Sequence, residues 1–154
     1  MTLKLPRALR DLLLLLARVG VGTVFLAHGL QKFLTNGMAA TTEGFVAMGV
    51  PAAGLSAWFA ALVETVGGAA LILGALTPVF ALLLAVDMIG AFLIYHLPFG
   101  IWVTDNGYEL VLALAAGALA LAAAGAGRFS VDGVLVKRPA GQAEPVREGV
   151  TAGA

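Results

Sequence analysis

The first apolar segment of the chain, residues 11–34, is long enough to cross a bilayer yet carries three basic side chains. As an α-helix it spans about 36 Å, against a hydrocarbon core of about 30 Å. A charge in hydrocarbon costs at least about 2.5 kcal/mol on insertion scales. Because successive helical residues are offset by about 100°, Arg18, His28 and Lys32 share a sector of roughly 80°. We therefore expect one polar face on this helix, which the other helices must accommodate.

Composition indicates a membrane protein and excludes several kinds of chemistry. Of the 154 residues, 60% are hydrophobic and 12% are charged, whereas a soluble domain has about 25% charged residues. The net charge is zero, which gives no argument for nucleic-acid binding. With no cysteine and only two histidines, the chain has no thiolate nucleophile and no multi-histidine metal site within one subunit. We expect the lipid bilayer as a partner and no metal site.

Hydropathy and helix-breaking residues predict four membrane-spanning helices. A short helix over residues 41–48, ended by Gly49-Val50-Pro51, is expected to lie in the membrane interface between the first two spans. The predicted fold is thus an all-α, four-helix transmembrane bundle with one short interfacial helix. The expected spans are residues 11–34, 53–76, 78–97 and 108–125.

The placement of Lys and Arg predicts that both chain ends are cytoplasmic. Basic residues precede the first span and follow the fourth, whereas only Lys32 lies at the opposite side. The positive-inside rule then places both ends in the cytoplasm of a protein of the plasma (inner) membrane, which requires an even number of spans. We expect residues 1–135 to form the transmembrane domain and residues 136–154 to form a flexible cytoplasmic tail.

The order and spacing of several short motifs resemble the DoxX family of small four-helix membrane proteins. The resemblance covers about residues 12–135, and Asp87 matches no recognised family position. It implies a small membrane subunit linked to quinone-dependent sulfur oxidation, or to membrane oxidoreductases of oxidative stress. The motifs are Ala17-Arg18, His28-Gly29-Leu30-Gln31-Lys32, Phe45 with Gly49-Val50-Pro51, Glu64-Thr65-Val66-Gly67-Gly68, His96, Gly107-Tyr108-Glu109-Leu110 and Gly125-Ala126-Gly127-Arg128-Phe129-Ser130-Val131-Asp132.

Position within the predicted spans separates the polar residues into two layers. Glu64 and Asp87 fall near the bilayer midplane, where the long side chain of Arg18 can reach one or both carboxylates. One interpretation of these three residues is a structural ion pair that joins helices. The other is a proton-binding site, because two neighbouring carboxylates cannot both ionise cheaply. Besides Glu64, the candidate ligand-binding residues lie toward the outer leaflet: His28, Gln31, Lys32, His96 and Glu109.

The two histidines leave three interpretations open. They can cap helix ends in the interface, they can bind a quinone carbonyl while Glu109 exchanges the proton, or they can ligate a haem, which we consider the weakest of the three. On an ideal helix His96 lies about 180° from Asp87, because nine residues separate them. The two side chains therefore share a cavity only if Pro98 or a bulge rotates the helix end.

Three functions are consistent with these residues. The first is a subunit or enzyme of quinone-linked redox chemistry, with quinone as the candidate cofactor. The second is a small-molecule or proton-coupled carrier that uses Glu64 and Asp87, although the chain has no internal repeat to support it. The third is a scaffold that recruits a soluble oxidoreductase through residues 128–154. The sequence has no catalytic nucleophile and no dinucleotide fingerprint, so the enzyme interpretation rests on the resemblance. A soluble or membrane oxidoreductase and a second copy of the chain are the candidate protein partners.

Overall fold

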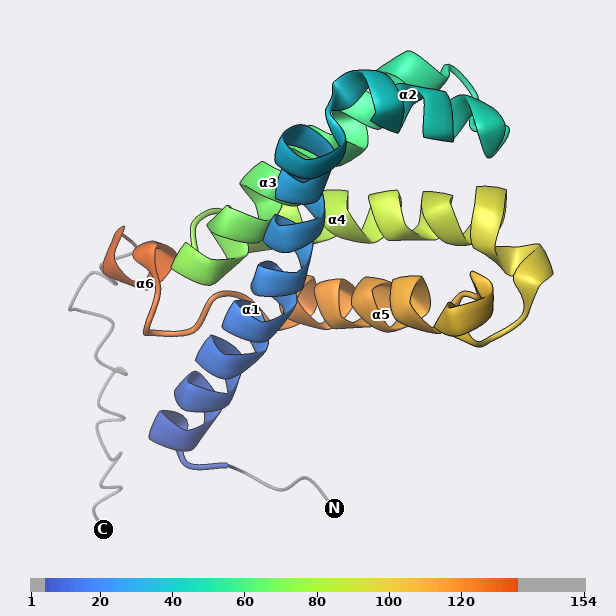
Figure 1. Cartoon of the computed structure of the whole chain (residues 1–154). Helices are drawn as coiled ribbons and strands as arrows, with labels where there is room; N and C mark the ends of the chain where they lie inside the picture. The colour runs from blue at the N-terminus through green and yellow to red at the C-terminus, as the bar shows by residue number, and fades with distance from the viewer. Residues whose placement is uncertain (1–4, 136–154) are drawn as a thin grey trace, which may run out of the picture.

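The computed structural model describes residues 5–135, and this part of the chain folds into helices and their connections (Figure 1). The predicted all-α fold is confirmed. The predicted tail, residues 136–154, lies outside the described residues. The main helices are α1 (Arg7–Leu30), α2 (Met38–Ala47), α3 (Ala53–Leu73), α4 (Thr77–Ala91), α5 (Glu109–Ala124) and α6 (Val131–Leu135).

Two of the long helices continue past their α-helical ends as π-helical turns. After α1 the chain makes a π-helical turn, Gln31–Asn36, and after α4 it makes another, Phe92–His96, followed by the 3-10 turn Leu97–Phe99. Counting these turns, three helices are long and apolar enough to cross a membrane: Arg7–Asn36, Ala53–Leu73 and Thr77–Phe99. The fourth predicted span, α5, is apolar but has only 16 residues, which is about 24 Å of helix.

The helices form two antiparallel pairs, α1 with α3 and α4 with α5, which cross each other (Figure 1). Glycines allow α1 and α3 to approach closely. A Cβ added at Gly68 would lie 2.5 Å from the backbone nitrogen of Leu26, and one added at Gly22 would lie 2.7 Å from the carbonyl oxygen of Gly68. Close backbone contact through small residues is the usual packing of helices in lipid. These contacts set the register of α3 against α1.

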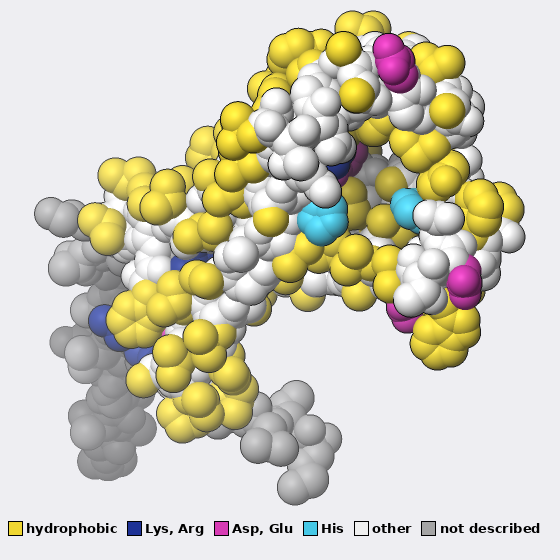
Figure 2. Space-filling model, viewed as in Figure 1, with side chains coloured by type: hydrophobic (Ala, Val, Ile, Leu, Met, Phe, Trp, Pro, Cys, Tyr) yellow, Lys and Arg dark blue, Asp and Glu magenta, His cyan; other side chains and the backbone are white. Residues whose placement is uncertain are grey.

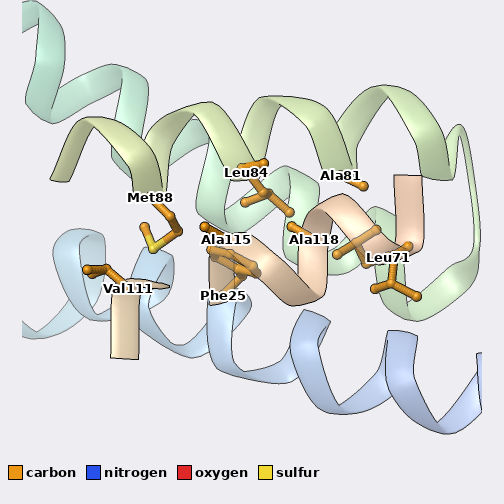
Figure 3. Close-up of a cluster of buried hydrophobic side chains, with 10 residues drawn as sticks. Phe25, Leu71, Ala81, Leu84, Met88, Val111, Ala115 and Ala118 are labelled. Atoms are coloured by element: carbon orange, nitrogen blue, oxygen red, sulfur yellow. The ribbon is translucent and has the colours of Figure 1, made fainter. Parts of the chain in front are cut away.

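The apolar core lies where the two helix pairs cross. The cluster includes Phe25 of α1, Leu71 of α3, and Leu84 and Met88 of α4, and alanines of α5 complete it (Figure 3). Many other large apolar side chains are exposed along the helices; Leu16 and Leu82, for example, are 59% and 52% exposed. This exposed apolar surface contacts the bilayer.

Arg18 does not pair with Glu64 or Asp87 as predicted. Its guanidinium is fully buried and donates to carbonyl oxygens at the end of α3, 3.1 Å from Leu71 and 3.5 Å from Ile72. It also donates to the carbonyl oxygen of Phe129 over 2.5 Å. The last carbonyls of a helix have no partner within it and carry partial negative charge, so a cation stabilises this end. The predicted pairing was wrong because α1 extends beyond the end of α3 (Figure 1), which brings Arg18 to that end and not to the carboxylates.

The segment after α5 folds back onto this same end of the bundle. The Asp132 carboxylate accepts the backbone N–H groups of Leu76 and Thr77, at 2.8 and 3.0 Å, and so caps the first turn of α4. The Asp11 carboxylate accepts the N–H of Arg128. The start of α1 and the segment before α6 therefore lie on one face, as an even number of spans requires. That this face is cytoplasmic stays a prediction.

Candidate functional site

A cavity of about 520 Å³ lies between the helices in the half of the molecule away from α6. In Figure 2 it is a hollow on the visible face, with histidine side chains at its edges. α1 and α5 touch near Val21 and Gly117 and diverge beyond, which leaves room for the cavity. Most of its wall is apolar, including Phe25, Phe45, Met48, Phe59, Ile94 and Leu114.

A buried ion pair stands in the wall of this cavity. The Lys32 ammonium lies 2.5 Å from the Glu64 carboxylate, and the two side chains are 17% and 6% exposed. Lys32 also lies 3.5 Å from the carbonyl oxygen of His28. The approach of Gly29 to Thr65, where a Cβ would overlap the Thr65 backbone, places the end of α1 beside Glu64. The glycine contacts therefore bring Lys32 to Glu64, where the sequence analysis had predicted Arg18.

Asp87 of α4 brings a second carboxyl to the same cavity. It lies close enough to Glu64 and Lys32 to interact with both electrostatically. One carboxyl oxygen, Oδ2, is buried and has no hydrogen-bond partner among the described residues. Ionisable side chains from the π turn after α1, from α3 and from α4 thus meet in one cluster. A buried polar atom without a partner is costly, so it marks a place where a ligand or water can bind.

The π-helical turn at Phe92–His96 brings His96 to the cavity that Asp87 lines. A π turn holds more residues than an α turn, so it rotates the residues that follow it relative to the α-helical face. This is the bulge that the sequence argument required for Asp87 and His96 to share a cavity. Nothing in the apolar sequence Phe92-Leu93-Ile94-Tyr95 indicates a π turn, and Pro98 was the only sequence signal near it.

Backbone carbonyls orient both histidines. Nδ1 of His28 lies 2.9 Å from the carbonyl oxygen of Val24, and Nδ1 of His96 lies 2.6 Å from that of Asn106. His28 is exposed and His96 is half-buried, and both line the cavity. A carbonyl only accepts, so Nδ1 carries the hydrogen in each ring.

Two of the predicted ligand-binding residues do not line the cavity. Gln31 is exposed on the outside of the first π turn. Glu109 instead accepts the backbone N–H of Val103 over 2.9 Å and fixes the loop before α5. Its position at the start of α5 explains this contact, because a carboxylate there faces the preceding loop. The two predicted layers are in fact one cluster: His28, Lys32, Glu64, Asp87 and His96 line a single cavity.

Comparison with known proteins finds one matching family and several similar membrane proteins. The family model described as DoxX matches residues 13–97, which include every residue of the cluster. An uncharacterized membrane protein of Mycobacterium tuberculosis is 34% identical, over 79% of this chain and 80% of that protein. The Escherichia coli "Inner membrane protein YqjF" is 32% identical, over 86% and 98%. The Bacillus subtilis "Putative oxidoreductase CatD" is 38% identical, over 50% and 54%. No solved structure matches the chain.

Proposed function

Since this chain belongs to the DoxX family of membrane proteins, we propose that its cavity binds a lipid-soluble quinone and that it acts as a subunit or enzyme of quinone-linked redox chemistry. The observation that carries the proposal is a largely apolar cavity with one polar cluster in its wall. The name of one relative, an oxidoreductase, supports the same class of chemistry.

The residues present fit such a ligand. The cavity volume lies within the range of about 300–1,000 Å³ that is usual for small-molecule sites. Its aromatic and aliphatic walls suit a quinone ring and the start of its tail, and polar atoms suit the two ring oxygens. When bound, a quinone exchanges two electrons and two protons with its reaction partners. Because the chain has no cysteine for a dithiol or iron–sulfur centre, we assign the electron exchange to a partner oxidoreductase.

The roles of the cluster follow from its chemistry. His28 and His96 accept hydrogen bonds from the ring hydroxyls of the reduced ligand at the edges of the cavity, because the Nε2 of each ring is not used by the backbone. Asp87 and the Lys32–Glu64 pair hold the protons that the ring oxygens lose or gain. The charge placement predicts that both chain ends are cytoplasmic, and in that orientation the cavity faces the outer half of the membrane.

Filling the cavity tests the proposal. Gly90 lines the cavity, and a Cβ added there meets nothing within 4 Å. Gly90→Leu is therefore expected to occupy the ligand space without disturbing the fold. We expect quinone to copurify with the parent protein in native lipid particles and to fall at least about tenfold in Gly90→Leu, measured by mass spectrometry.

The matched control is Gly20→Leu. Gly20 also has nothing within 4 Å of an added Cβ, but it is exposed on α1 and does not line the cavity. Both changes replace a helical glycine by the same side chain, so their effects on helix propensity and hydropathy match. Equal quinone content in Gly90→Leu, Gly20→Leu and the parent protein would show that the cavity is not the site.

A further inference from the structure

We propose that the cavity selects the reduced, dihydroxy form of its ligand over the oxidised dicarbonyl form, and that Asp87 is the main residue that determines this preference. The inference rests on the proposed function and adds the redox form of the ligand to it. It follows from which polar atoms of the cavity remain free and whether they donate or accept hydrogen bonds.

The histidines present acceptors. Nδ1 of each ring donates to a backbone carbonyl, that of Val24 for His28 and that of Asn106 for His96. A neutral imidazole has one N–H, so its Nε2 must then be an acceptor. Neither Nε2 has a partner in the part of the chain that the structure describes. Two acceptor nitrogens therefore remain for the ligand.

The ionised form of Asp87, which is the form that can take up a proton from the ligand, presents the third acceptor. Its Oδ2 is buried, and no protein donor reaches it within residues 5–135. The nearest cation, Lys32, is directed to the other carboxylate, that of Glu64, over 2.5 Å. A ligand hydroxyl that donates to Oδ2 removes the cost of this unpaired atom, whereas a ligand carbonyl oxygen placed there adds a second acceptor and repels it.

Most donors of the cavity are already used. The Lys32 ammonium donates to Glu64 and to the carbonyl oxygen of His28, which leaves one of its three N–H groups. The hydroxyl of Ser56 donates to the carbonyl oxygen of Pro51 over 2.7 Å. The Tyr95 hydroxyl can donate or accept a hydrogen bond, so it favours neither the reduced nor the oxidised form of the ligand. Three free acceptors, from His28, His96 and Asp87, thus outnumber the one free N–H of Lys32. They complement the two O–H donors of a hydroquinone better than the two carbonyls of a quinone.

The test compares the two redox forms of one ligand on the full-length protein. The protein is reconstituted in lipid nanodiscs and titrated without oxygen with decylubiquinone and with decylubiquinol, and binding is followed by the rise in Tm. We expect decylubiquinol to bind about tenfold more tightly, because one satisfied buried hydrogen bond is worth roughly that factor. Asp87→Asn keeps the shape of the side chain but adds an N–H donor, so it is expected to bring the two affinities within about twofold of each other.

Two further variants serve as a control and as a second test of the named acceptors. Glu43→Gln changes an exposed carboxyl of α2 that does not line the cavity, and it should leave the preference unchanged. His28→Phe keeps a ring at an exposed position and removes one acceptor, so it should lower the preference by a few-fold even if Asp87→Asn fails to fold.

Each outcome decides between the two proposals. Equal binding of both forms, or tighter binding of decylubiquinone, overturns the selection inference and leaves the proposed function standing. A preference for decylubiquinol that neither Asp87→Asn nor His28→Phe reduces also overturns the inference, because the named acceptors would then not be its source. Failure of both forms to bind the parent protein overturns the proposed function itself.

Discussion

At the scale of residues, the buried charges fall into two groups with different partners. Arg18 is held by carbonyl oxygens at the end of α3, so its charge stabilises the fold at the face where α6 lies. Lys32 is held by Glu64 in the cavity wall. The sequence could show that these charges needed partners, because charges in hydrocarbon are costly. It could not show which partners they had, because that depends on the register between α1 and α3.

The Lys32–Glu64 pair gives a prediction at this scale. Lys32→Met leaves the buried Glu64 carboxyl without its cation, and breaking such a pair costs about 3–5 kcal/mol of unfolding free energy. The double variant Lys32→Met/Glu64→Leu removes both charges and is expected to recover most of that loss. Thermal unfolding followed by circular dichroism, with the protein in detergent, measures both. A double variant as unstable as the single one would show that the pair does not form.

At the scale of elements, helix boundaries were predictable and helix interiors were not. Gly37 and Gly125 follow the ends of two helices within a few residues of the predicted span ends at 34 and 125, because both glycines adopt a positive φ that helices exclude. The π turn at Phe92–His96 interrupts an apolar run that fits an α-helix equally well. It was therefore invisible to periodicity, although it determines that His96 reaches the cavity. The candidate site was only partly predictable for this reason.

The contact between α1 and α3 gives a prediction for the elements. Gly68→Ala places a Cβ 2.5 Å from the backbone nitrogen of Leu26, so the two helices must separate. We expect a loss of about 1–3 kcal/mol of unfolding free energy, as for overpacking in other cores. Gly20→Ala is the control, because its added Cβ meets no neighbour. If Gly68→Ala unfolds at the same temperature as Gly20→Ala, this contact does not set the helix register.

At the scale of the whole molecule, the two crossed helix pairs have different ends. At one end the segment before α6 joins the start of α1 to the turn between α3 and α4. At the other end the pairs diverge, and α2 and the loop before α5 help to line the cavity between them. Composition predicted the bundle, since only helices with satisfied backbones suit this apolar chain in lipid. It could not predict a cavity, because a cavity depends on how far the helices diverge.

Photoaffinity labelling with an azidoquinone, followed by mass-spectrometric mapping of the labelled peptides, tests most directly whether the cavity binds quinone. The protein is labelled in lipid nanodiscs, with and without an excess of unlabelled decylubiquinone. We predict label within residues 25–32 and 86–96, removed by the competitor and absent from Gly90→Leu. Label spread over the lipid-facing residues of all helices, unchanged by the competitor and by Gly90→Leu, would contradict the assignment of this cavity as a quinone site.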